Sequence, residues 1–385
     1  MTKTASLGTQ LKAKVRFLHV SILMLVSGCM GGGRINSDST SRTDLSDLGL
    51  EPNQIDITNS MASLTGAAIK GPLSNAFVFL DKHTETKINP DTGLIELDAQ
   101  GNHILIGNGI RDEDEAFAYT AQDGSYSIEV EIEGSELTLG EGFWNDDGSI
   151  AFDNTAENSS LDNFKETHSL VVKTLSTTTD ASSGQPLPGV TLSAPIDAKV
   201  VSPFTTLMNI GGLTSDEIKV AFGINDQVQI EDFNPYKSFS NDEIVSGMEG
   251  SAVKIENLAQ QIVAVTTSIA GSLEASSLTP DAAYNTALRA VISEIENSTS
   301  PVDLSTRTTL NNIANTARVT AKSDNAASFD ALLFEQAQDL LLDELEALNN
   351  DLKNVTELRS TETSETYSKV SNLSAKVSSS IEEGR

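Results

Sequence analysis

Apolar side chains follow two different spacings along the chain, and the change comes near Pro203. Before it, residues 125–132 (SYSIEVEI) alternate apolar and polar side chains, which predicts a half-buried strand. Residues 75–80 (NAFVFL) form a short apolar run of the same kind. Turn signals rich in Gly, Pro, Asn and Asp separate these runs. Residues 62–203 are therefore expected to fold as an antiparallel β-sandwich.

After Pro203 the apolar residues recur at helical spacing. Helices are predicted around residues 255–269, from the Thr279-Pro280 start, over 304–317 and over 329–358. The last of these carries a leucine seam, which would either bind a partner helix or pack inside a bundle: Leu341, Leu345, Leu348, Leu352 and Val355. The expected fold class is α+β, with an α-helical bundle over 204–358 and a polar tail over 359–385 that keeps a helical repeat.

The amino-terminal segment has the parts of a secretory signal. Four basic residues and no acidic ones precede an apolar run at 17–26 (FLHVSILMLV), and small residues then lead to Cys29. A run of this length is too short to cross a bilayer as a helix. The sequence VSGC resembles the lipobox of bacterial lipoproteins. The resemblance implies cleavage after residue 28 and a lipid on the Cys29 sulfur. The residues that follow are rich in Gly, Ser, Thr and Asp, which predicts a flexible linker over 29–61. Met30, instead of aspartate, favours the outer membrane.

The charge and cysteine content narrow the possible functions. The 385-residue chain has a formal net charge of −30 and a single cysteine. Such a surface repels phosphate backbones, so no nucleic-acid partner is expected, and the expected membrane attachment is through lipid. With Cys29 lipidated, the mature chain would have neither disulfides nor cysteine metal sites.

Several segments resemble an adhesin-like module of Gram-negative surface proteins. They are GAAIKGPLSNAFVFLD (66–81), NGIRDEDE (108–115), TAQDGSY (120–126) and LSAPIDAKVVSPFTTLM (192–208). The resemblance implies a prealbumin-like sandwich, of the class that includes carboxypeptidase-regulatory-like domains, followed by helices. Asn75 stands where the family has glycine, and residues 82–107 form an insertion that the family lacks.

Four oxygen-bearing residues suggest a calcium site. Asn108, Asp112 and Glu115 keep the second half of a calcium-loop spacing, and Asp81 would supply the first ligand if the insertion loops out. Calcium would then close the loop structurally. The alternative is a solvated acidic loop without a cation.

The protein is expected to be a non-enzymatic, adhesin-like or envelope binding module. It would bind an unidentified extracellular or envelope ligand through the long 82–107 loop. An envelope hydrolase acting on glycan or peptide is the alternative, although the chain contains no H-E-x-x-H or G-x-S-x-G motif. A structural assembly lipoprotein using the leucine seam is the third reading. His83 and His103, the acidic cluster near Asp146 and the aromatic Trp144 are weaker candidates for metal or sugar binding.

Overall fold

The strands of this protein occupy its first half and its helices the second. The computed structural model describes residues 59–87, 95–97, 103–133, 166–237, 248–324 and 329–383. The strands are β1 (Asn59–Ala68), β2 (Leu73–Ser74), β3 (Phe77–Lys82), β4 (Glu85–Thr86), β5 (Leu105–Ile106), β6 (Phe117–Tyr119), β7 (Ser125–Glu133), β8 (His168–Lys173), β9 (Thr179–Asp180), β10 (Gln185–Pro186), β11 (Thr191–Pro195) and β12 (Val200–Val201). The helices are α2 (Pro203–Gly211), α3 (Ser215–Phe222), α4 (Glu249–Ala275), α5 (Pro280–Asn297), α6 (Arg307–Asp324), α7 (Ala331–Lys353) and α8 (Thr361–Glu383).

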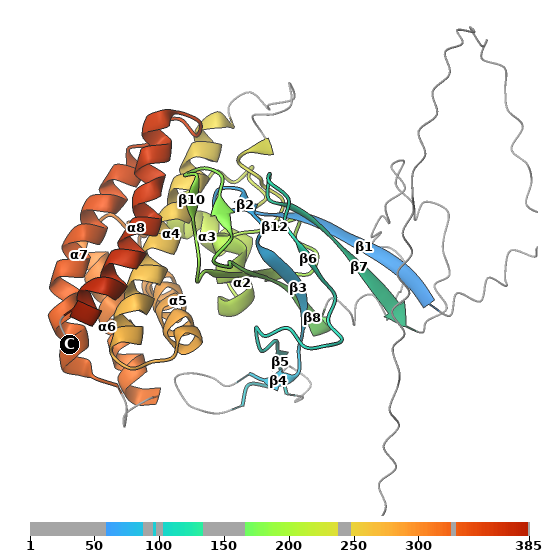
Figure 1. The fold of residues 1–385 in the computed structure, drawn as a ribbon, viewed down its shortest axis with the longest axis horizontal. Helices are drawn as coiled ribbons and strands as arrows, with labels where there is room; N and C mark the ends of the chain where they lie inside the picture. Colours follow the sequence, from blue (N-terminus) through green and yellow to red (C-terminus); the bar gives the residue numbers. More distant parts are fainter. Residues whose placement is uncertain are drawn as a thin grey trace, which may run out of the picture. The chain divides into compact units, whose positions relative to one another are not determined.

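The predicted mixed α+β class is confirmed, with small and mainly antiparallel sheets (Figure 1). One sheet has the order β11-β8-β3-β6 and a second has the order β12-β1-β7, in which the β1–β12 pair is parallel. Two smaller sheets have the orders β10-β9-β2 and β4-β5. β1 pairs with β7 from Asn59 onwards, so residues 59–61 of the predicted linker already lie in a strand.

The predicted alternation in β7 is visible in its burial. Tyr126, Ile128 and Val130 are buried, whereas the side chain of Glu129 between them is exposed. The adjacent apolar run becomes β3 two residues later than predicted, because Asn75 has a φ of 58° and turns the chain before the strand begins. Asparagine is one of the few residues besides glycine that tolerates this left-handed conformation, which explains how it can replace a glycine here.

A single buried cluster joins the strands to the helices. Val78 of β3, Ile128 of β7, Phe204 of α2 and Ile262 of α4 all belong to it. α4 lies at the centre of the helical part and contacts α5, α7 and α8 (Figure 1). Residues 56–385 consequently form one compact unit.

The chain changes from strand to helix at Pro203 for a local reason. Ser202 caps α2 and forms a capping box with Thr205, and proline takes the first helical position. Pro280 likewise takes the first position of α5, as the sequence predicts, but its N-cap Thr279 makes no side-chain capping hydrogen bond. α3 has a second capping box, made by Thr214 and Glu217. Sequence periodicity did not indicate α2 or α3, because both helices are short.

The leucine seam of α7 faces the interior. Leu341, Leu345, Leu348 and Leu352 are buried in the main cluster, and α7 contacts α4, α6 and α8. Of the two readings of the seam, internal packing therefore accounts for these leucines. The polar tail forms α8, which buries Tyr367, Val370 and Leu373.

Several sequence predictions lie outside the described residues. They include the signal segment, Cys29, most of the 29–61 linker, Trp144 and the acidic cluster near Asp146.

Candidate functional site

Two of the four predicted calcium ligands, Asp81 and Glu115, bind backbone N–H groups through their carboxylates at the end of β3. Asn108 Oδ1 instead accepts the Ile110 backbone N–H at 2.7 Å, and Asp112 takes part through its backbone. The Asp81 carboxylate accepts the backbone N–H groups of Asn108 (3.2 Å) and Gly109 (2.8 Å). The Glu115 carboxylate accepts those of Lys82 (2.7 Å) and Asp112 (2.8 Å). The Asp81 and Glu115 carboxylates thus bind the chain at both ends of the 82–107 insertion and in the 108–115 loop that follows it.

Burial makes the Asp81 carboxyl group an unusual acid. It is only 3% exposed, and desolvation is the main cause that raises its pKa to about 6. The neighbouring charges of Glu115 and Asp112 raise the pKa further, while the two backbone N–H groups oppose the shift. Asp112 itself is exposed. In the described part of the chain, no group of three His, Cys, Asp or Glu side chains is placed to hold a metal ion.

The insertion places apolar side chains on the surface. Its described residues form the β4–β5 hairpin, extended by a bridge between Leu97 and His103 (Figure 1). Among the described residues, the exposed large apolar side chains concentrate in one stretch of the sequence. These are Ile95, Leu97, Leu105, Ile110, Phe117 and Tyr119, with four others scattered over α2, α3, α6 and α7.

An aromatic cluster lies on one face of the four-stranded sheet, at its β3–β6 edge. β3 and β6 pair Phe77 with Tyr119 and Phe79 with Phe117. The Phe77 ring centroid is 5.4 Å from those of Phe117 and Tyr119. The Arg111 guanidinium lies 4.4 Å from the Phe117 ring centroid, within the range of a cation–π contact. Phe117 and Tyr119 are about half exposed, at 47% and 54%. The six exposed apolar residues between 95 and 119 are called the apolar patch below: Ile95, Leu97, Leu105, Ile110, Phe117 and Tyr119.

The histidines lie in separate settings. His83 Nδ1 is 2.8 Å from the Glu166 carbonyl oxygen, and desolvation lowers its pKa. His103 lies in the bridge to Leu97, and His168 begins β8, where its Nδ1 is 3.0 Å from the Thr167 hydroxyl.

A second group of functional side chains is buried where β9 meets α4. The Lys70 ammonium lies 2.9 Å from Asp180 Oδ2, and both side chains are fully buried. The other oxygen, Asp180 Oδ1, accepts hydrogen bonds from the Ser182 backbone N–H (2.8 Å) and hydroxyl (2.5 Å). The Glu256 side chain, also fully buried, contributes a second carboxyl group.

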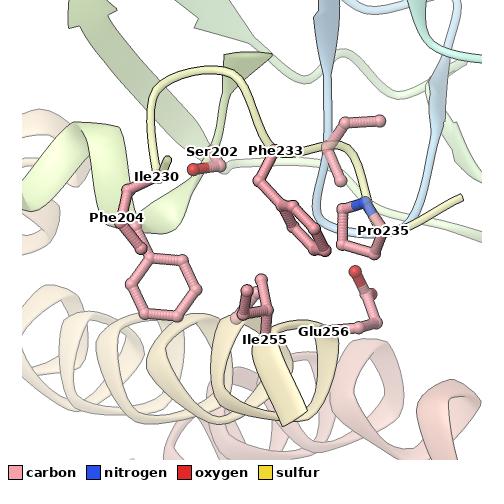
Figure 2. A pocket seen from close by; sticks show the side chains of 9 residues that line it. Ser202, Phe204, Ile230, Phe233, Pro235, Ile255 and Glu256 are labelled. Atoms are coloured by element: carbon pink, nitrogen blue, oxygen red, sulfur yellow. The ribbon is translucent and has the colours of Figure 1, made fainter. Parts of the chain in front are cut away.

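Glu256 accepts one side-chain hydrogen bond, from Gln260. Its Oε1 accepts the Gln260 Nε2 hydrogen bond at 2.7 Å, whereas Oε2 has no hydrogen-bond partner in the described part of the chain. Desolvation and the Asp180 charge raise its pKa to about 7, while the Gln260 hydrogen bond, the Lys70 charge and the nearby Gly71 backbone N–H oppose the shift. Figure 2 shows its carboxyl group directed from α4 toward Pro235, into a cavity of about 10 Å³.

The sequence did not single out this buried cluster. Lys70 lies within the GAAIKGPL segment, but it is 110 residues from Asp180, and no fixed spacing connects either of them to Glu256. The only local signal is Gly71, whose φ of +65° and close packing against the Asp180 carboxylate leave no room for a Cβ atom. A sequence pattern cannot show which distant carboxylate approaches a lysine in the fold.

No known protein family, curated protein or solved structure matches this chain. Within the described ranges, none of the helices combines the length and the hydropathy needed to cross a membrane.

Proposed function

We propose that this protein is a lipid-anchored binding module of the bacterial outer membrane. It would act by adhesion to an extracellular or envelope ligand rather than by catalysis. The lipobox-like sequence at Cys29 supports the anchor, and the apolar patch supports the binding role.

The apolar patch is the observation that carries the binding role. Large exposed apolar side chains are usually scattered singly over a soluble protein, and their concentration marks a contact surface. Here six of them fall between residues 95 and 119, in the insertion, in the loop after it and in the edge strand β6. Tyr119 and Phe117 are of the residue types that contribute most to binding energies, and Arg111 stacks on one of them. The Asp81 and Glu115 hydrogen bonds hold this surface in position.

We also propose that the strands form a prealbumin-like sandwich leading into a helical bundle. Side chains from the four-stranded sheet (Leu80, Val172) and from the β12-β1-β7 sheet (Ile128, Val130) share one buried cluster, as facing layers of a sandwich do. The helices α4 to α8 would then be the bundle.

Binding measurements on paired variants test the proposed function. The chain beginning after Cys29 is expected to be retained by at least one of three probes: intact bacterial cells, isolated cell walls or extracellular-matrix protein. The double variant Phe117→Ser with Tyr119→Ser should weaken that retention by at least about tenfold, since two central aromatic anchors are worth more than 1.4 kcal/mol.

The matched control replaces two apolar residues elsewhere that are more exposed than Phe117 and Tyr119. Val220→Ser with Val319→Ser alters α3 and α6, where the side chains are 73% and 60% exposed. This control should bind like the unmodified chain. Absence of retention on all three probes, or equal weakening by both double variants, contradicts a binding surface at the apolar patch.

Calcium stays part of the proposal as a structural ion at Asp81, Asn108, Asp112 and Glu115. Carboxylate and amide oxygens suit this cation, and an extracellular millimolar concentration fills even weak sites. The same carboxylates already accept four backbone N–H groups, so the loop has a way to close without an ion.

A further inference from the structure

We propose that Lys70 and Asp180 condense to an intramolecular amide bond within the folded protein, with Glu256 relaying a proton between them. The inference is independent of the binding role proposed above. It rests on four geometric features of the buried cluster, taken in turn below.

The first feature is proximity without water. Lys70 Nζ and Asp180 Oδ2 are 2.9 Å apart, and neither side chain is exposed. Amine and carboxyl groups do not condense in water, where both are charged and solvated. A dry interior instead lowers the cost of the neutral amine and carboxylic acid relative to the ion pair. A fixed contact distance also removes most of the entropic barrier to reaction.

The second feature is a pair of donors on the oxygen that would gain charge. Attack of the amine on Asp180 Cγ moves negative charge to Oδ1. That oxygen already receives the Ser182 backbone N–H at 2.8 Å and the Ser182 hydroxyl at 2.5 Å. Preorganised donors of this kind stabilise the oxyanion of a tetrahedral intermediate. Gly71 lets the backbone approach the same oxygen closely.

The third feature is a carboxyl group that charge balance does not require. Lys70 and Asp180 already neutralise each other, so a static ion pair needs no second acid. Glu256 is nonetheless fully buried beside them, with Oε2 free of any hydrogen bond in the described part of the chain. The other polar groups that face it are Gln260 on the same helix, Tyr236, and Tyr367 of α8, which donates to Asn257 Oδ1 at 2.7 Å.

The reaction balances without any further reagent. One proton passes from the Lys70 ammonium to Asp180 Oδ2, and the freed nitrogen lone pair forms the bond to Cγ. Glu256 accepts a second proton from that nitrogen and gives one to Oδ2. The Cγ–Oδ2 bond then breaks, its electron pair leaves with Oδ2 as water, and the Oδ1 carbonyl re-forms. Glu256 ends in the protonation state in which it began.

The fourth feature is a small cavity beside Glu256 that would receive the water. Lys70 and Asp180 do not line this cavity, but Ile69, the residue before Lys70, does. The cavity that Glu256 lines measures about 10 Å³, roughly the space that one water molecule needs (Figure 2). Ser202 supplies a further polar group at its wall, among apolar residues such as Phe233 and Ile255.

Peptide mapping of the full-length purified protein by tandem mass spectrometry tests the bond. A protease specific for lysine and arginine should fail to cut after Lys70. It should release a branched peptide that joins the Lys70 and Asp180 segments, lighter than the two separate peptides by one water molecule. Linear peptides with unmodified Lys70 and Asp180 from the folded protein overturn the proposal. So does a water loss confined to a linear Asp180 peptide, which indicates a succinimide.

Variants separate the bond from a merely structural ion pair. In Asp180→Asn, ammonia leaves instead of water, so the branched peptide should have the same mass as in the unmodified protein. Glu256→Gln should give only linear peptides while its thermal transition shows a folded chain. A folded Asp180→Asn without the branched peptide, or a Glu256→Gln with it in full yield, contradicts the assigned chemistry. Should Glu256→Gln not fold, the unmodified protein and Asp180→Asn still decide.

An exposed ion pair gives the matched control. Lys353 Nζ lies 2.7 Å from Asp303 Oδ2, closer than Lys70 to Asp180, but the two side chains are 54% and 41% exposed. Peptides around Lys353 should be linear in every sample. A branched peptide there in comparable yield attributes cross-linking to sample handling and overturns the proposal.

Discussion

At the scale of single residues, Asp81 links folding to pH. Its unfolded carboxyl group loses a proton near the ordinary value of 3.8, whereas burial raises the pKa in the folded chain to about 6. Between these values the folded state binds more protons than the unfolded state. The contribution of Asp81 to stability is therefore greatest below the unfolded pKa and declines as pH rises through the folded pKa.

Asp81→Asn should flatten the pH dependence of stability in that window. The shift corresponds to roughly 2–3 kcal/mol, and an amide does not titrate. Urea unfolding at several pH values between about 4 and about 7 measures the slope. Asp114→Asn is the control, because this exposed carboxylate lies in the same loop. If Asp81→Asn and the unmodified protein keep the same slope, Asp81 does not carry the effect.

Calcium at the same loop has the opposite linkage. A cation binds the ionised carboxylates, so its stabilising effect should grow as pH rises above about 6. Millimolar calcium would then raise the melting temperature near neutral pH, and Asp112→Ala with Glu115→Ala would abolish the response. An unchanged melting temperature in millimolar calcium means that the N–H groups alone close the loop.

At the scale of elements, the α7 seam contributes to the core. Leu345 is fully buried, so Leu345→Ala removes its burial and leaves a cavity, which should lower the free energy of unfolding by about 2–5 kcal/mol. Leu332→Ala on the same helix is the control, since this leucine is 64% exposed and its loss should cost less than about 0.5 kcal/mol. Chemical denaturation measures both. Equal effects would place Leu345 outside the core.

The sequence predicts long, strongly periodic elements better than short ones. The start of α5 at Pro280 and the alternation of β7 follow from local signals that burial reinforces. α2 and α3 span too few turns for a periodic stripe, so only their ends carry local signs: the capping boxes, Pro203 and the glycines that follow each helix. Two-residue strands such as β9 exist only because distant residues pair with them.

The candidate sites divide in the same way. The oxygen chemistry of the sequence indicates Asp81 and Glu115, and the structure places both carboxylates on backbone N–H groups of the same loop; the calcium site itself stays a prediction. The Lys70–Asp180–Glu256 cluster depends on the register of β2 with β9 and on where α4 packs. Neither the strand register nor the helix packing can be predicted from local sequence, so the cluster is found only in the three-dimensional structure.

At the scale of the whole molecule, the proposed amide bond would connect the segment between β1 and β2, which contains Lys70, to Asp180 in β9. It would close a loop of 110 residues. By analogy with a disulfide over a loop of this length, the lost entropy of the unfolded chain is worth about 4–5 kcal/mol. Such a cross-link would offset the repulsion among like charges, which destabilises a folded chain with a formal net charge of −30. The single cysteine of the sequence cannot form a disulfide within the chain.

The proposed lipid anchor would determine where such a body works. Each buried methylene of an acyl chain contributes about 0.8 kcal/mol of membrane affinity, so the fatty chains proposed on Cys29 would hold the protein against its own charge repulsion from anionic lipids. Cys29→Ser removes the sulfur that carries them. It should abolish incorporation of labelled fatty acid and move the protein from the membrane pellet to the soluble fraction. Ser27→Ala keeps a small residue beside the processing site and should leave both properties unchanged. Membrane retention of Cys29→Ser at the level of this control would refute the anchor, because the acidic chain has no other proposed means of binding a membrane.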